Sequence, residues 1–490
     1  MFLNSCNLRK YLTILFCRAV LLLVGLAAVF IVVSRVGVTF ALLVVSVGLF
    51  ALICLVHPIV GVVSVLGFAF INPSLLPVLA EFSEFSLRYV DIPLIILMVV
   101  IWIKISVRGR VGISKKLIAL SAPLLPFLAW IGMSTIIVSL TIPNFWATSL
   151  ASYIRLVETA LFSLILYLSI REPSELEMIL KMLIVFSIAT VVVGAWETWQ
   201  QYGQGEIIAG RYGGLLGINS LGLVSGLLII YAFLERSGKR HGLKWMIFVM
   251  AGALGLFLSR SISSTLAVAG ALALYFIISK QPHKIHRKST WKRIFASVFL
   301  ILLAGVLVWY LRTSDVRGLL SLSGGSLAQR LMIIYAGFFI FINHPLAGVG
   351  WQASATETII GDPELNAVLM EKFPQLPQHY FFIDKPTSLH NFYIQILAEL
   401  GLIGATLFIF ALWHTGKAVA RIVENIDADS PHRIIARFCM LGLVFLLLWW
   451  NTNPLYGGQI ETVLAFSFLT LLARAADFER QRTMGIGRAK

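Results

Sequence analysis

Long uninterrupted apolar runs constrain this chain more than any other feature. Stretches such as 38–56 and 118–140 hold no charged residue and are about as long as a helix that crosses a bilayer. Of the 490 residues, 59% are hydrophobic and 13% are charged, whereas an ordinary soluble domain carries about 25% charged residues. Because lipid cannot satisfy backbone polar groups, each run is expected to be helical. The sequence therefore predicts an all-α polytopic membrane protein.

The apolar runs predict about 12–14 transmembrane helices. Several runs are close to the shortest length that spans a bilayer, and the two at 243–258 and 262–279 have almost no loop between them. The predicted helices are 12–33, 38–56, 59–79, 90–106, 118–140, 151–170, 178–200, 214–234, 243–258, 262–279, 294–311, 391–412, 434–450 and 459–473.

The distribution of basic residues predicts how the chain is oriented. If the N-terminus is cytoplasmic and there are about fourteen spans, all of the Lys- and Arg-rich loops lie on the cytoplasmic side, as the positive-inside rule requires. These loops are 104–117, 235–244, 280–293, 413–437 and the tail after 473. Both termini are then cytoplasmic. The same loops account for the net charge of +16, and no glycine-rich phosphate loop or aromatic-basic patch indicates a nucleic-acid partner.

One connection on the outer side is far longer than the others. The chain divides into transmembrane helices over 1–311, an outer loop or cap over 312–390, and C-terminal transmembrane helices with a cytoplasmic tail over 391–490. The loop contains an amphipathic piece, Leu327–Ile342, and a turn-rich stretch, His344–Gly350. Loops of this length in compact proteins are usually functional, so we expect short helices folded over the outer membrane face.

Three arginines run against the charge trend, because they are expected on the outer side. Arg211 precedes one span, Arg260 lies in the tight turn between two short spans, and Arg330 begins the amphipathic piece. Guanidinium groups bind phosphate oxygens in a bidentate manner, so a cluster of three would hold a lipid diphosphate. The alternative for each is a contact with lipid headgroups or with a local acid.

His390 lies where the long polar loop meets the apolar helix at 391–412. Imidazole titrates near physiological pH and can accept a proton from a sugar hydroxyl; the alternative is that His390 only caps or orients the helix. Asn391 would orient His390 or bind substrate.

Glu399 is nine residues further on, which places it on the opposite helical face. Gly401 and Gly404 are expected to be positions of close helix packing.

Charged residues inside the predicted spans are few. Arg155 and Glu158 are three positions apart on one predicted helix, so a local ion pair is the simplest interpretation. On the outer loops, no Asp-x-Asp motif or His/Asp spacing indicates a metal site, and no cofactor is expected.

Taken together, these motifs resemble the O-antigen ligase and O-antigen polymerase superfamily of bacterial inner-membrane glycan transferases. The resemblance covers roughly residues 200–405. It rests on an ordered set of motifs: Arg211-Tyr212-Gly-Gly with Asn219, Leu258-Ser-Arg-Ser261, Arg330, His344–Gly350, and His390-Asn391 followed by Glu399-Leu-Gly401-Leu-Ile-Gly404.

The resemblance implies a metal-independent, inverting glycosyltransferase with a GT-C-like architecture in the bacterial inner (plasma) membrane. Its donor would be a glycan on undecaprenyl diphosphate at the periplasmic face. Carried over by position, Arg211, Arg260 and Arg330 would bind the diphosphate, His390 would activate the acceptor hydroxyl, and Asn391, Asn219 and Tyr212 would support the site. In the absence of a metal, arginines would neutralise the leaving diphosphate.

The acceptor stays open at this point. A ligase would use lipid A-core, whereas an O-antigen or exopolysaccharide polymerase would use a second lipid-linked repeat, and protein O-oligosaccharyltransferases share the pattern. The motifs favour the ligase only slightly. The alternative from another class is a lipid or polysaccharide transporter, which predicts inverted repeats, interrupted helices and binding residues at the membrane midplane.

Overall fold

The structure is a computed structural model of the chain. It describes residues 38–71, 80–82, 85–87, 91–108, 112–142, 145–203, 216, 218–237, 244–278, 326–382, 388–455 and 460–485. The predicted spans at 12–33 and 294–311 lie outside the described residues, as do Arg211 and Tyr212.

The described residues form a helical bundle, as the apolar runs predict. The N-terminal half contains α2 (Val38–Val56), α3 (Pro58–Ala69), α4 (Asp91–Arg108), α5 (Lys115–Ser121), a 3₁₀ turn (Ala122–Leu124), α6 (Leu125–Thr141), α7 (Trp146–Ser169) and α8 (Pro173–Gly203). The remainder contains α9 (Ile218–Ser237), α10 (Lys244–Ser259), α11 (Ile262–Ile278), α14 (Ser326–Asn343), α15 (Pro363–Lys372), α16 (Phe392–Glu424), α17 (His432–Trp449) and α18 (Ile460–Thr483).

The multi-pass character is confirmed. Within the described part of the chain, six helical segments are long and apolar enough to cross a membrane: Lys115–Val138, Trp146–Ser169, Pro173–Gln200, Asn219–Arg236, Phe392–Glu424 and His432–Thr452. Shorter apolar helices, among them α3, α10 and α11, pack beside them. Two details differ from the predictions. The span expected at 59–79 ends as a helix at Ala69, and a two-stranded antiparallel hairpin, β1 (Ala80–Phe82) and β2 (Phe85–Leu87), occupies the loop at 80–89.

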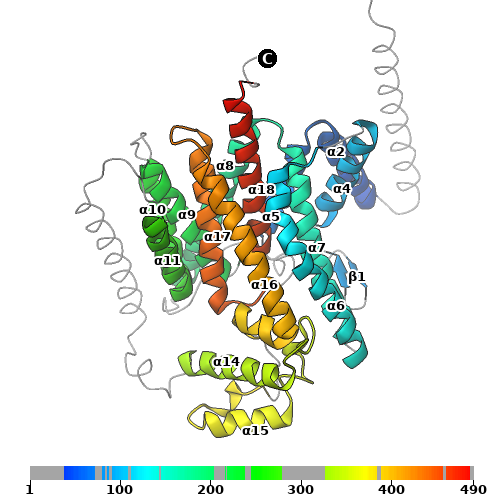
Figure 1. Ribbon diagram of the computed structural model, residues 1–490, viewed down its shortest axis with the longest axis vertical. Helices are drawn as coiled ribbons and strands as arrows, with labels where there is room; N and C mark the ends of the chain where they lie inside the picture. Colours follow the sequence, from blue (N-terminus) through cyan, green and yellow to red (C-terminus); the bar gives the residue numbers. More distant parts are fainter. Residues whose placement is uncertain are drawn as a thin grey trace, which may run out of the picture.

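Helices α14 and α15 lie across one end of the bundle, beside the start of α16, while α18 ends at the opposite end (Figure 1). This cap has an apolar core of its own, which includes Met332, Leu369 and Phe382. Val138 of α6 and Ala398 of α16 belong to the same core. The segment between α14 and α16 is therefore packed onto the bundle through shared buried side chains.

A second, larger core joins the helices of the bundle. Serine and threonine side chains buried within it donate hydrogen bonds to the backbone carbonyls four residues earlier, as Ser187 and Thr159 do. Other small residues allow close contact between helices. A Cβ atom at Gly222 of α9 would lie 2.7 Å from the Ser261 side chain, and one at Gly226 would lie 2.7 Å from Val268. The start of α9 therefore packs directly on the α10–α11 turn.

Candidate functional site

His390 immediately precedes α16 and is exposed. The next residue, Asn391, caps the helix: its Oδ1 accepts hydrogen bonds from the backbone N–H groups of Tyr393 (3.0 Å) and Ile394 (3.1 Å). Its Nδ2 donates to the carbonyl and to Oδ1 of Asn451, at 2.8 and 3.1 Å. Asn391 is buried, and its whole amide is engaged. It therefore holds the backbone beside His390, which fits the predicted orienting role better than direct contact with substrate.

Arg330 lies in the first turns of α14 and is exposed. Helix α14 lies close to the start of α16: a Cβ atom built at Gly337 would lie 3.1 Å from the Leu389 side chain. Although one side of His390 is open, partial burial of its ring lowers the pKa of His390 below the ordinary value, and the positive charge of Arg330 lowers it further. Both effects favour the neutral form of the imidazole, which is the form that can accept a proton.

Arg260 occupies the turn between α10 and α11 with a backbone φ of +47°. A left-handed conformation is uncommon for a non-glycine residue and often marks a functional site. A chain of contacts connects this turn to His390. Ser264, one turn into α11, accepts a hydrogen bond from the Trp449 indole at 3.2 Å. Trp449 ends α17, and Asn451 follows it and bonds to Asn391. Arg260, Arg330 and His390 therefore lie at the same end of the bundle.

Asn219, predicted as a supporting residue, lies in the first turn of α9 and is exposed. Its helix begins beside the Arg260 turn, as the contact between Gly222 and Ser261 shows. Three of the predicted motifs therefore meet in space: the end of the Arg211–Gly222 stretch, the Leu258–Ser261 turn and the His390 helix start. Arg211 and Tyr212 themselves lie outside the described residues.

The turn-rich motif His344–Gly350 is inserted into a break in α16. Gly401 has φ +62° and ψ −164° inside the helix. The backbone N–H groups of Leu402 and Ile403 donate to the carbonyls of Pro345 (2.8 Å) and Leu346 (3.2 Å). The prediction that Gly401 packs against another helix is therefore wrong, because its missing side chain admits the backbone of the loop instead. The prediction for Gly404 is confirmed, since a Cβ atom there would lie 3.2 Å from Trp130 of α6.

Hydrogen bonds in the opposite direction complete this junction. The N–H groups of Val349 and Gly350 donate to the carbonyls of Ala398 (3.0 Å) and Glu399 (2.9 Å). The carbonyl of Leu400 accepts from the Trp130 indole at 3.1 Å. Buried backbone groups need partners, and here the loop and α6 supply those that the broken helix cannot. Two motifs that are about fifty residues apart in the sequence thus form one structural unit.

Glu399 anchors the same loop through its side chain. The carboxylate is buried and accepts hydrogen bonds from the Gln352 N–H (2.9 Å), the Ser354 hydroxyl (2.5 Å) and Nε2 of Gln395 (3.1 Å). Gln352, like Arg260, has a positive φ, at +63°. The hydrogen bonds of the Glu399 side chain go to Gln352, Ser354 and Gln395 and not to His390. This agrees with its predicted position on the other face of the helix. Its role in fixing the loop was missed, because it depends on residues almost fifty positions earlier.

Trp351 fastens the loop to α6 and α7. Its side chain is fully buried. Its backbone N–H donates to Ser134 Oγ (2.6 Å), its indole donates to Ser152 Oγ (3.2 Å), and its carbonyl accepts from Ser149 Oγ (2.7 Å). The serines inside the apolar helices α6 and α7 indicate that a polar group contacts them. The sequence does not indicate that this group is Trp351.

One turn deeper on α7, the predicted pair of Arg155 and Glu158 is confirmed at 3.3 Å. Arg155 also forms an ion pair with Asp91, at the start of α4. Buried charges are costly without partners, so this ion-pair triad accounts for the charges of Arg155, Glu158 and Asp91 and ties α4 to α7. It leaves Arg155 engaged with carboxylates.

Residues 245–409 match a family model described as O-Antigen ligase, a segment that runs from α10 through the first half of α16. It contains Arg260, Arg330 and His390. A search of curated proteins found no match. Residues 245–409 are therefore similar to the O-antigen ligase family, and the six long apolar segments are those of a multi-pass membrane protein.

Proposed function

We propose that the protein transfers a glycan from undecaprenyl diphosphate to an acceptor hydroxyl at the periplasmic face of the bacterial inner membrane. The observation that carries this proposal is that Arg260, Arg330 and His390, from three separate parts of the chain, lie at one end of the bundle. A base and at least two guanidinium groups are the parts that such a transfer needs. Both termini would then be cytoplasmic, and the cap of α14 and α15 periplasmic.

In the proposed reaction, the acceptor hydroxyl attacks the anomeric carbon of the donor glycan while neutral His390 takes the hydroxyl proton. The bond between that carbon and the diphosphate oxygen breaks, and the oxygen keeps the electron pair. Arg260 and Arg330, joined by Arg211, neutralise the charge that develops on the diphosphate. Metal is not required for these steps, and a single displacement inverts the anomeric carbon.

Of the acceptors, we favour lipid A-core, which makes the protein an O-antigen ligase. The alternative is an O-antigen or exopolysaccharide polymerase, in which a second lipid-linked repeat supplies the hydroxyl. The test is to incubate the purified protein with an undecaprenyl-diphosphate glycan and each acceptor in turn, in the presence of a chelator, and to identify the product. Transfer to lipid A-core supports the ligase, and an extended lipid-linked chain supports the polymerase.

His390→Ala and Arg260→Ala should abolish transfer while the protein still inserts and folds. Suitable controls are His414→Ala and Arg421→Ala, because both residues are exposed on the part of α16 beyond the Gly401 break. Full activity of both site variants in a cell-surface glycan assay would rule out the mechanism. No product with any acceptor would instead favour a transporter.

A further inference from the structure

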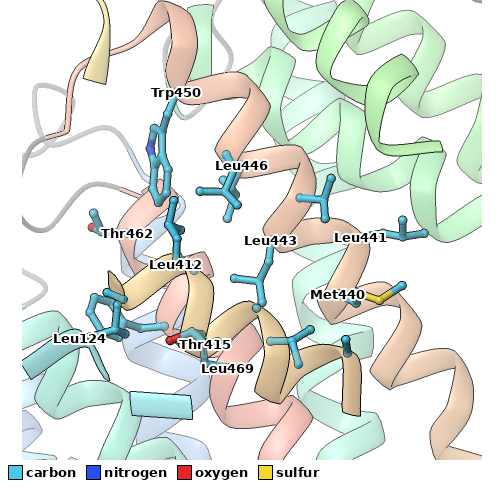
Figure 2. Close-up of a pocket in the computed structure, with 18 of the residues that line it drawn as sticks. Leu124, Leu412, Thr415, Met440, Leu441, Leu443, Leu446, Trp450, Thr462 and Leu469 are labelled. Carbon is cyan, nitrogen blue, oxygen red and sulfur yellow. The ribbon is translucent and has the colours of Figure 1, made fainter. Parts of the chain in front are cut away.

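An elongated cavity of about 600 Å³ lies among α6, α11, α16, α17 and α18. Its walls are almost entirely apolar. Figure 2 shows Leu412 of α16, Leu443 and Leu446 of α17 and Leu469 of α18 around it. In a soluble protein such a space would indicate an apolar ligand. In a membrane bundle, the ligand at hand is a lipid chain.

The cavity extends along the helices rather than across them. Along α17 and the residue that follows it, the lining residues run from Arg433 to Trp450. Seventeen helical steps correspond to about 26 Å, close to the roughly 30 Å thickness of the hydrocarbon core of a bilayer. Gly416 of α16 lines this space without a side chain, and a Cβ atom built there would meet no atom within 4 Å. The shape therefore suits an extended chain lying parallel to the helices.

Charge is confined to one end of this cavity. The charged residues in its lining are Arg433, Arg437 and Glu424, a net charge of +1 at the end remote from His390. Among the described residues, neither arginine forms an ion pair with a carboxylate. The guanidinium of Arg437 lies 5.7 Å from the centre of the Tyr275 ring. Four residues apart, the two arginines face the same side of α17.

At the His390 end the described lining residues carry no charge. Phe392, Trp450 and Leu455 line the cavity there, and its polar groups are the indole N–H of Trp450 and the hydroxyl of Thr462, neither of which neutralises the charge of a phosphate. A lipid whose headgroup lay at this end would leave the two arginines without an anion. The charge distribution therefore places the headgroup of the occupant at the arginine end.

We propose that this cavity binds an anionic diacyl phospholipid from the leaflet opposite His390, with an acyl chain in the apolar slot and the phosphate on Arg433 and Arg437. Basic pockets between transmembrane helices bind anionic headgroups in this way, and guanidinium forms bidentate hydrogen bonds with phosphate. The site is separate from the proposed donor site and does not depend on the proposed reaction.

The test is native mass spectrometry of the detergent-solubilised full chain with added dioleoylphosphatidylglycerol or dioleoylphosphatidylcholine. We expect the wild type to retain phosphatidylglycerol in preference to phosphatidylcholine, and the double variant Arg433→Ala/Arg437→Ala to bind it at least about tenfold more weakly. The matched control is Lys417→Ala/Arg421→Ala. Those residues remove the same charge from the same end of the bundle, but neither lines the cavity.

A second pair of variants tests the acyl slot independently of the headgroup. Gly416→Leu should fill the space without a backbone clash and abolish retention, whereas Gly416→Ala should preserve it. Equal binding of the two lipids, or unchanged binding by the arginine variant, would overturn the proposal. The proposal would also be overturned if a polyprenyl phosphate displaced phosphatidylglycerol and still bound to the arginine variant. The occupant would then be a prenyl chain.

Discussion

The Glu399 carboxylate offers the sharpest test of how the site is held together. Replacement by alanine would leave the Gln352 N–H buried without an acceptor, at a cost of about 1–3 kcal/mol. It would also remove the hydrogen bond from Ser354, worth about 1.5–3 kcal/mol when the acceptor is charged. Gln395 keeps a second acceptor, the Leu455 carbonyl, at 3.3 Å. We therefore expect Glu399→Ala to lower the free energy of unfolding by about 2.5–6 kcal/mol.

Glu399→Gln should behave differently. Its carbonyl oxygen can keep the hydrogen bonds from Gln352 and Gln395, and its amide can donate to the Ser354 hydroxyl, so we expect a loss of less than about 1 kcal/mol. Glu371→Ala, on the exposed surface of α15, is the control. The measurement is denaturant unfolding in mixed micelles, alongside the transfer assay. An alanine variant within about 1 kcal/mol of the wild type would refute the proposed anchoring role.

Three further outcomes follow from the same geometry. Gly401→Ala should lower the free energy of unfolding by about 1–3 kcal/mol, because the residue has a positive φ and its Cβ would meet the inserted loop. In thermal unfolding, the control Gly416→Ala should have a midpoint equal to or above that of the wild type. In a pH–rate profile, the transfer rate should fall on the acidic side at a pH below the ordinary histidine pKa of 6.5, because burial and Arg330 lower the pKa of His390. Arg330→Gln should move this fall to higher pH. An unchanged profile would show that Arg330 does not act on His390. Trp351→Phe should lower the free energy of unfolding by about 1 kcal/mol through loss of one indole hydrogen bond, measured in the same micelle assay.

Several helices could be predicted from the sequence nearly to the residue, whereas those expected at 59–79, 391–412 and 459–473 have bounds of Pro58–Ala69, Phe392–Glu424 and Ile460–Thr483. The spans expected at 243–258 and 262–279 are α10 and α11, and the amphipathic piece Leu327–Ile342 is α14, longer by one residue at each end. Apolar runs bounded by polar residues leave little freedom in lipid, because the backbone must satisfy itself. The same argument placed Arg260 in a turn at the same end as His390, before any contact was known.

The break at Gly401 could not be predicted in this way. Leu400 and Leu402 continue the apolar pattern through it, so periodicity indicates an unbroken helix from 391 to 412. The break exists because the loop at 345–350 supplies substitute hydrogen bonds, and pairings between such distant segments leave no trace in local periodicity. The ion pair between Arg155 and Asp91 and the anchoring of Trp351 were missed for the same reason.

That break also bears on the choice between a transferase and a transporter. Discontinuous helices in transporters leave backbone carbonyls near the midplane, where they coordinate ions or substrate. The Gly401 break lies nine residues into α16, about 14 Å from its start, so its depth alone would suit such a site. Its carbonyls, however, are already engaged: those of Ala398, Glu399 and Leu400 accept hydrogen bonds from Val349, Gly350 and Trp130. A break whose carbonyls already accept hydrogen bonds from the chain itself is poorly suited to coordinate an ion or substrate, and its effect is to fix the cap beside His390. The interruption of α16 therefore supports a site built at the bundle end.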